Sequence, residues 1–142
     1  MSLNKEYEGI MGYDNSFVLE NLFGKELKLM AKDLSFWKYE EAVDYKPYDV
    51  YISLSDGKMV DGVAILPIDE IMTEVNEAFS DWEKLSDNVW EYDDESIEIY
   101  TTEQFVRFDC YGVSQDNMNK LIDIMIDFDC CLYDSSIDVR FE

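Results

Sequence analysis

Carboxylates are the abundant reactive side chains of this chain, which has 33 Asp and Glu against 11 Lys and Arg. Two carboxyl groups about 5–10 Å apart in a cleft can act as general acid and base when burial raises one pKa. Asp61 is the acid whose strand parity indicates burial, and no partner carboxyl can be named for it. Histidine is absent, which excludes Ser-His and Cys-His nucleophilic machinery. We therefore expect a protein that is not an enzyme.

The oxygen-rich segments lack the ligand spacing of a metal site. A calcium loop places oxygens at alternating positions around a glycine turn, with a distal bidentate Glu. Neither Asp93-Asp94-Glu95 nor the segment 56–62 has this spacing. The glycines stand singly, without a phosphate-binding loop or a dinucleotide fingerprint. We expect no metal and no cofactor.

A row of acids lies on the outer face of the helix expected after Pro67. Glu70, Glu74, Glu77 and Asp81 follow one another at spacings of 4, 3 and 4, which places all four on one side of a helix. One interpretation is a solvated face that keeps the protein soluble. The other is a landing surface for a basic partner, because such a field raises association rates about 10 to 1,000-fold at low salt.

Aromatic residues supply the second ingredient of a partner surface. Trp90 and Tyr92 share one face of an expected strand, and tyrosine and tryptophan beside carboxylates are common interface anchors. The alternative is that both cap the core of the sheet. The full set predicted to bind a partner is Glu70, Glu74, Glu77, Asp81, Trp90, Tyr92, Asp93, Asp94 and Glu95. Three further aromatics, Tyr45, Tyr48 and Tyr51, precede or begin an expected hairpin.

That hairpin is the clearest local signal. Val50, Ile52 and Leu54 alternate with more polar residues, and Asp56-Gly57 is a preferred type I′ turn. The returning strand is expected to run to Leu66. Its parity points Asp61 toward the apolar side, unless a bulge at the adjacent Gly62 turns it outward, which we favour.

Two amphipathic helices and several strands follow. The first helix opens at Pro67, and the second is capped by Ser114, with Val113 and Met118 at the spacing of a hydrophobic staple. The core stripes are Ile68, Ile71, Met72, Val75, Phe79 and Trp82 in the first, and Met118, Leu121, Ile122, Met125 and Phe128 in the second. Strands are expected at 89–92, 97–100, 105–111 and, at the end, 137–141. Phe17 to Phe23 could form a short helix, and Glu26 to Met30 a strand.

A length of 142 residues, with 47% hydrophobic and 15% aromatic residues, fits one folded domain over 1–142. The order of elements predicts an α+β fold. We expect a mainly antiparallel sheet with two amphipathic helices packed on one face, a two-layer sandwich. Residues 1–45 are the least defined part, with an N-terminal helix plus strand as the expectation.

Charge and cysteine content limit the ligands and the cellular compartment that we expect for the protein. The net charge is −22, and residues 59–142 hold 22 acids against 4 bases, which argues against nucleic acid as a ligand. No apolar run approaches the roughly 20 residues of a membrane span, and the N-terminus has no secretory layout. Cys110, Cys130 and Cys131 form no CxxC pair and are expected to be reduced thiols, so we predict a cytoplasmic protein.

Within residues 50–142, three features occur together: a small acidic α+β layout, a negative helix face, and the segment Cys130-Cys131-Leu132-Tyr133-Asp134-Ser135 turning into a short strand. This combination resembles bacterial toxin-immunity proteins. The resemblance implies a non-catalytic inhibitor that binds a basic partner, such as a nuclease toxin, by charge and shape complementarity. A structural or self-assembling module is the alternative, so a homo-oligomer stays open. A carboxylate- or metal-dependent enzyme is the third hypothesis.

Overall fold

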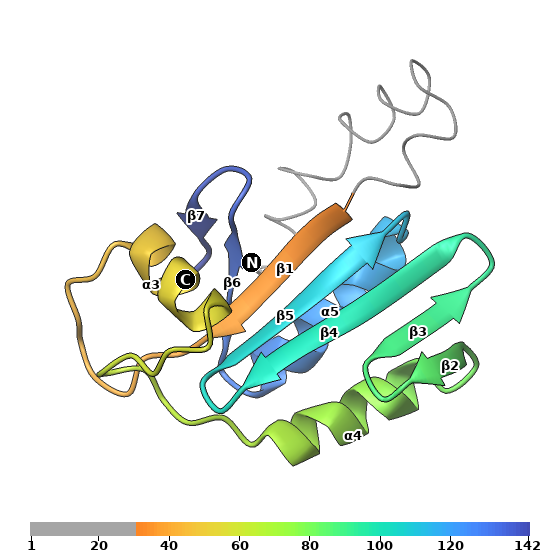
Figure 1. Ribbon diagram of the computed structural model, residues 1–142, viewed down its shortest axis with the longest axis horizontal. Coiled ribbons are helices and arrows are strands. Elements are labelled where there is room, and N and C mark those ends of the chain that lie inside the picture. Colours follow the sequence, from red (N-terminus) through yellow and green to blue (C-terminus); the bar gives the residue numbers. More distant parts are fainter. Residues whose placement is uncertain (1–30) are drawn as a thin grey trace.

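A seven-stranded sheet, with every neighbouring pair antiparallel, is the centre of the fold (Figure 1). The computed structural model describes residues 31–142, and three helices accompany the sheet there. The predicted α+β class with a mainly antiparallel sheet is confirmed. The helix expected at 17–23 and the strand expected at 26–30 lie outside the described residues.

The sheet order is β2-β3-β4-β5-β1-β6-β7. The strands are β1 (Ala31–Trp37), β2 (Glu83–Ser86), β3 (Val89–Tyr92), β4 (Glu95–Thr102), β5 (Phe105–Tyr111), β6 (Cys131–Asp134) and β7 (Val139–Arg140). The predicted strands 89–92 and 105–111 coincide with β3 and β5, and 97–100 lies inside β4. Strand β1, which the sequence pattern did not define, lies between β5 and β6 near the middle of the sheet.

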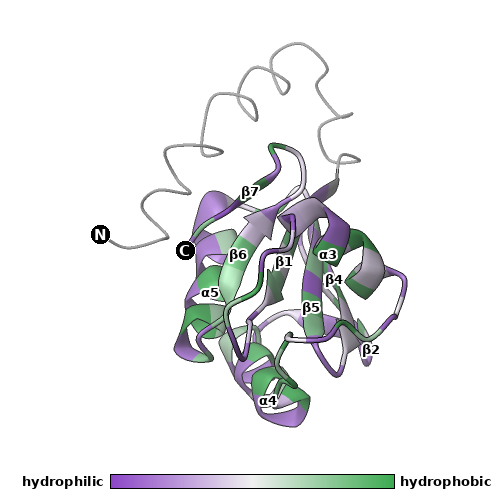
Figure 2. Cartoon of the chain, turned by 90° about the vertical axis from the view of Figure 1, so that its left-hand side faces the viewer, coloured by the Kyte–Doolittle hydropathy of each residue, from purple (hydrophilic) through white to green (hydrophobic). Residues whose placement is uncertain are grey.

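The larger core joins one face of the sheet to α4 (Ile68–Ala78) and α5 (Gln115–Asp127). Both helices carry most of the apolar stripe that the sequence predicts, and Figure 2 shows apolar and polar residues interleaved along each of them. Phe79, Trp82 and Phe128, which the sequence placed on the helices, lie beyond the helix ends but still pack into this core. Phe36 of β1 and Phe108 of β5 meet edge to face, with ring centroids 5.9 Å apart. The buried residues of this core from the sheet are Leu34, Phe36, Trp90, Ile97, Ile99, Val106, Phe108, Cys110 and Leu132.

Helix α5 begins as predicted. The Ser114 hydroxyl accepts a hydrogen bond from the Asn117 amide at 3.2 Å, as an N-cap does. The carboxylate of Glu95 accepts two further hydrogen bonds here, from the Ser114 amide at 2.7 Å and from Asn117 Nδ2 at 2.9 Å. The start of α5 is therefore fixed to the beginning of β4.

The predicted hairpin at 49–66 is wrong, because its first half is the helix α3 (Pro47–Ser55). Pro47 occupies the first helical turn, where its missing N–H is not needed. Val50 and Leu54, four residues apart, both face inward and are buried, as one side of a helix requires. In a strand they would also share a face, so the alternation at 50, 52 and 54 fits either structure.

Asp56-Gly57 ends this helix instead of reversing a hairpin. The Gly57 amide donates to the Leu54 carbonyl and the Lys58 amide to the Ser53 carbonyl, both at 3.0 Å, which is the Schellman pattern. Gly57 has φ +82, but Asp56 has φ −81, whereas a type I′ turn needs positive φ at both residues. The returning strand is absent from this segment. Asp61 is exposed beside Gly62 at φ +86, but it lies in a loop, so the predicted strand parity and the bulge at Gly62 do not apply.

Helix α3 forms a second core on the opposite face of the sheet. Trp37 is adjacent to Phe36 in β1, and Phe105 is adjacent to Val106 in β5. Because successive side chains of a strand point to opposite faces, Trp37 and Phe105 point away from the larger core. The buried members of this second core are Trp37, Val50, Leu54, Val63, Phe105 and Tyr133. The described residues thus hold a third helix on the other face, and the predicted two-layer sandwich with two helices is not established.

The C-terminal strand is shorter than predicted. Within 137–141 only Val139–Arg140 pairs as β7, while Ile137 and Val139 are exposed and Phe141 is buried. The preceding strand β6 lies between β1 and β7, and Leu132, Tyr133 and Asp134 are all buried. A strand covered on both faces has no alternating pattern, which is why the sequence did not reveal it.

Two glycine substitutions test the conformation of this region. Gly57→Ala should lower the free energy of unfolding by about 1–2 kcal/mol, because a Cβ at positive φ is strained although its nearest neighbour, the Tyr100 hydroxyl, is 3.6 Å away. Gly62→Ala should be more damaging, since its Cβ would also lie 2.7 Å from Val43 Cγ1. Urea unfolding measures both, and equal losses would contradict the geometry at Gly62.

Candidate functional site

The structure splits the predicted acidic row: Glu70, Glu74 and Glu77 lie on α4, whereas Asp81 lies three residues beyond the helix, in the turn that leads to β2. Glu70, Glu74, Glu77 and Asp81 are all exposed, and none of them forms an ion pair within residues 31–142. The nearby Lys84 donates instead to Asn76 Oδ1 at 3.0 Å and lies over the Trp90 ring at 5.2 Å. The row therefore faces solvent without an ionic partner in the described part of the chain.

The aromatic pair beside the row divides into one core residue and one surface residue. Trp90 is 2% exposed and belongs to the larger core, so it has no surface to offer a partner. Tyr92 is 48% exposed and stacks on Trp82, with ring centroids 5.9 Å apart and planes 28° apart. Since Trp82 directly follows Asp81, Tyr92 lies next to the end of the acidic row.

The acids of the β3–β4 turn divide in the same way. Asp93 and Asp94 are exposed, and Asp93 adopts φ 52 in the tight turn. Glu95 is half-buried, and its carboxylate accepts hydrogen bonds from the start of α5. Of the nine residues predicted to bind a partner, the structure leaves seven exposed and uses Trp90 and Glu95 for folding.

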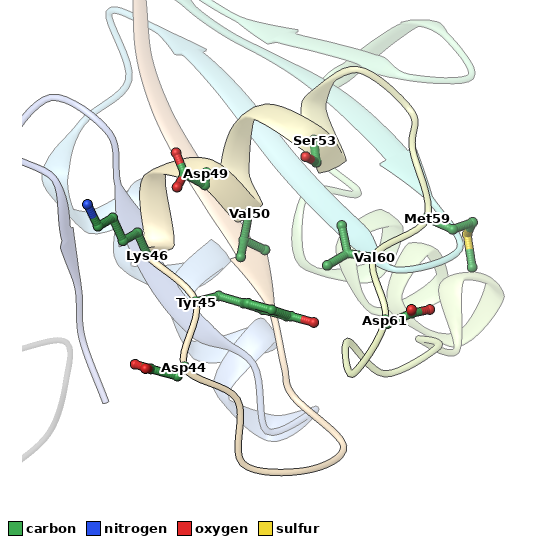
Figure 3. Close-up of a pocket in the computed structure, with 9 residues that line it drawn as sticks. All are labelled: Asp44, Tyr45, Lys46, Asp49, Val50, Ser53, Met59, Val60 and Asp61. Atoms are coloured by element: carbon green, nitrogen blue, oxygen red, sulfur yellow. The ribbon is translucent and has the colours of Figure 1, made fainter.

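A second candidate surface, which the sequence did not predict, is a groove of about 570 Å³ beside α3 (Figure 3). The ring of Tyr45 extends from the start of α3 toward the loop that carries Met59, Val60 and Asp61. Val50 flanks the ring from the helix and Val60 from the loop. Asp44, Lys46 and Asp49 lie at one end of the groove and Asp61 at the other, and the side chains of Asp44 and Asp49 point away from the Tyr45 ring.

Two of the residues that line the groove are large exposed hydrophobic residues: Tyr45 is 44% exposed and Met59 60%. On α3, outside the lining, Tyr48 is 49% exposed and Ile52 39%, whereas Ile65, at 58%, lines a separate hollow beside Pro67. The sequence carried a signal for the exposed side of α3, because Tyr48 and Ile52 are four residues apart, but the hairpin interpretation put Ile52 on a strand.

A buried glutamine holds the wall of the groove. Gln104 is 3% exposed, and its amide nitrogen donates to the carbonyls of Val60 at 2.9 Å and Val63 at 2.8 Å. Its amide oxygen accepts from the Val60 N–H at 2.8 Å. Three hydrogen bonds to one side chain therefore satisfy backbone groups of an irregular loop and hold the loop in place.

A polar cluster lies on the same face of the sheet as α3. Asp33 of β1 faces Asp109 of β5, Arg107 binds Asp109 through Nε at 2.9 Å, and the Tyr51 hydroxyl donates to Asp33 at 3.3 Å. Burial, followed by the hydrogen bond and charge of Asp109, raises the pKa of Asp33. The structure thus pairs two carboxyls that the sequence did not single out, whereas Asp61 has no such pairing.

Within residues 31–142 no group of three or more Cys, Asp or Glu side chains is arranged to hold a metal ion. The helices described there are too short and too polar to cross a membrane. The three thiols are free, and burial raises the pKa of Cys130 to about 12. Burial raises the pKa values of Cys110 and Cys131 as well, which disfavours their reactive thiolates at neutral pH.

In comparisons with known proteins, no family model, no curated protein and no solved structure matches the chain.

The carboxyl pair gives a prediction about stability and pH. Because the folded protein raises the pKa of Asp33, it binds that proton more tightly than the unfolded chain. The resulting stability is present at low pH and is lost as the pH rises through the folded pKa. Asp33→Asn imitates the protonated form, so it should increase the free energy of unfolding at pH 7 and have little effect near pH 3.

Urea unfolding of wild type and Asp33→Asn between pH 3 and pH 8 measures this difference. The exposed Asp87, in the β2–β3 turn, supplies Asp87→Asn as a control with the same change of charge. If the difference in free energy of unfolding between wild type and Asp33→Asn does not grow with pH, the raised pKa of Asp33 is contradicted.

Gln104 gives a second prediction. Gln104→Met keeps the size of the side chain but leaves the Val60 N–H and two carbonyls without their partner, so the protein should lose about 2 kcal/mol of stability. Gln115→Met is the control, because the half-buried Gln115 donates to the Asn119 side chain one turn along α5, at 2.9 Å, and its side chain holds no backbone group within residues 31–142. Denaturant titration compares them, and equal losses would rule out the anchoring role of Gln104.

Proposed function

We propose that this protein is a non-catalytic domain that binds a basic protein, as an immunity-type inhibitor of a toxin such as a nuclease would. The observation that carries the proposal is the exposed acidic row, three carboxylates on α4 and Asp81 in the turn after it, without an ion pair among the described residues. We place the protein in the cytoplasm, where its three free thiols would stay reduced.

The geometry of the row suits a partner that presents several cations. Glu70 and Glu77 are seven residues apart along α4, which corresponds to about 10 Å of helix. Tyr92 and Asp93 adjoin the far end, so an aromatic contact and further charge lie next to the row. Charge of this kind steers a basic protein during encounter, and Tyr92 supplies area that can be desolvated in the complex.

Self-assembly is less favoured as a function. A net charge of −22 opposes association of identical chains. The edge strand β2 is short and carries Glu83 and Lys84, and charged side chains protect a sheet edge from pairing. Light scattering should therefore find a monomer at physiological salt.

The row can be tested by neutralising it. The variant Glu70→Gln, Glu74→Gln, Glu77→Gln, Asp81→Asn should capture less basic protein from a lysate of the source organism. Its association rate with the captured partner should fall about tenfold or more at low salt, because the steering field is weakened. The fold should persist, since four exposed acids are replaced and like-charge repulsion along the helix is removed.

A control variant makes the same change of charge on other elements: Asp87→Asn, Asp116→Asn, Asp127→Asn and Asp129→Asn, all of them exposed. Its association rate should fall less than that of the α4 variant. Equal reductions would show that only net charge matters, and a column that retains no basic protein at low salt would refute the proposed function.

A further inference from the structure

We propose that the groove beside α3 binds a basic amphipathic segment of the partner, with an apolar side chain against Tyr45 and Met59 and cations near the carboxylates at its ends. This inference rests on the proposed function, because the occupant belongs to a basic protein. It names a second surface, distinct from the α4 row, and the chemistry that this surface recognises.

The lining of the groove mixes polar and apolar residues, and its accessible apolar surface comes mainly from Tyr45, 44% exposed, and Met59, 60% exposed. Val50 beside them is buried and Val60 is half-buried. Tyrosine and methionine are enriched at the centres of interfaces, where they bury large area with few polar groups to satisfy. An aliphatic or aromatic side chain inserted next to Tyr45 would remove this surface from water.

The carboxylates at the ends of the groove select the charge of the occupant. Residues 40–61 hold six carboxylates against two lysines. Three carboxylates, Asp44, Asp49 and Asp61, and one lysine, Lys46, line the groove, so its lining keeps an excess of negative charge. None of the three carboxylates forms an ion pair within residues 31–142. An acidic or neutral segment would leave these carboxylates uncompensated on binding, whereas arginine or lysine would pair with them.

The groove is also held in place before anything binds. Gln104 fixes the wall at Val60, and the Schellman pattern at Gly57 fixes the end of α3. Tyr51 anchors α3 to the sheet, with its ring 5.3 Å from that of Tyr133 and 6.3 Å from that of Phe105. A preformed surface of this kind binds without a large ordering penalty. A second copy of the chain is a poor occupant, because it brings the same negative charge.

The probe is a short blocked peptide that repeats Arg-Arg-Leu, added to the ¹⁵N-labelled full chain at low salt. Two matched peptides accompany it: one replaces arginine by neutral citrulline, and the other replaces leucine by serine. The amide signals of residues 44–61 should shift with the Arg-Arg-Leu peptide. The citrulline peptide should bind at least tenfold more weakly, and the serine peptide several-fold more weakly.

Variants separate the groove from the α4 row. Asp44→Asn, Asp49→Asn, Asp61→Asn should weaken binding about tenfold, and more than the charge-matched Glu70→Gln, Glu74→Gln, Glu77→Gln. Met59→Ser should weaken it several-fold at low and high salt alike, whereas Leu85→Ser, at a residue 52% exposed on β2, should not. All these positions are exposed, and the amide spectrum of each variant shows whether it is folded.

Shifts confined to α4, or groove variants that bind like wild type, would overturn the groove and leave the proposed function standing. Equal binding of the leucine and serine peptides would show that the apolar surface of the groove is not used, which also overturns it. Shifts of 44–61 that depend on protein concentration without peptide would assign the groove to a second copy. If no cationic peptide binds, the groove proposal fails, and lysate capture decides the proposed function separately.

Discussion

The pairing of β1 with β5 is the interaction on which the rest of the structure depends. Strand β1 joins the β2–β5 meander to β6 and β7, so without it the sheet would fall into two parts. Phe36 and Trp37, consecutive residues of β1, are fully buried and enter opposite cores. Burial of each side chain contributes about 1.5–3 kcal/mol or more to stability. Both helical layers are therefore positioned by one strand, and so are the α4 row on one face and the α3 groove on the other.

Electrostatics imposes the second constraint. Three cations have structural roles: Lys32 binds Asp134 at 2.8 Å, Arg107 binds Asp109, and Arg140 stacks on Tyr39 at 4.6 Å and donates to the Trp37 carbonyl. These three hold strands together and do not offset the acids of the outer surface. The negative charge that remains outside is consequently concentrated on surfaces with no folding role that we can identify, and α4 is the clearest of them.

The sequence predicted the parts of the fold in which local pattern and tertiary environment agree. A stripe of period 3.6 specified α4 and α5, and Ser114 marked the start of the latter. It failed where two structures share a pattern. Val50 and Leu54 face one side of a helix and also one side of a strand, and Gly57 with positive φ suits a Schellman end and a type I′ turn equally. For the site, exposure of the α4 row followed from spacing, whereas the burial of Trp90 and the occupation of Glu95 depend on contacts distant in sequence.

The two surfaces would act at different stages of one binding event. The carboxylates along α4, which form no ion pair among residues 31–142, act over roughly a Debye length of 8–10 Å, so their effect falls on the encounter rate and weakens with salt. The groove acts only after contact, because desolvation of Tyr45 and Met59 needs a complementary side chain in place; its effect falls on the dissociation rate and persists in salt. An acidic surface by itself would bind any basic protein loosely. Selectivity in this protein would therefore come from the α3 groove, the element that the sequence pattern concealed.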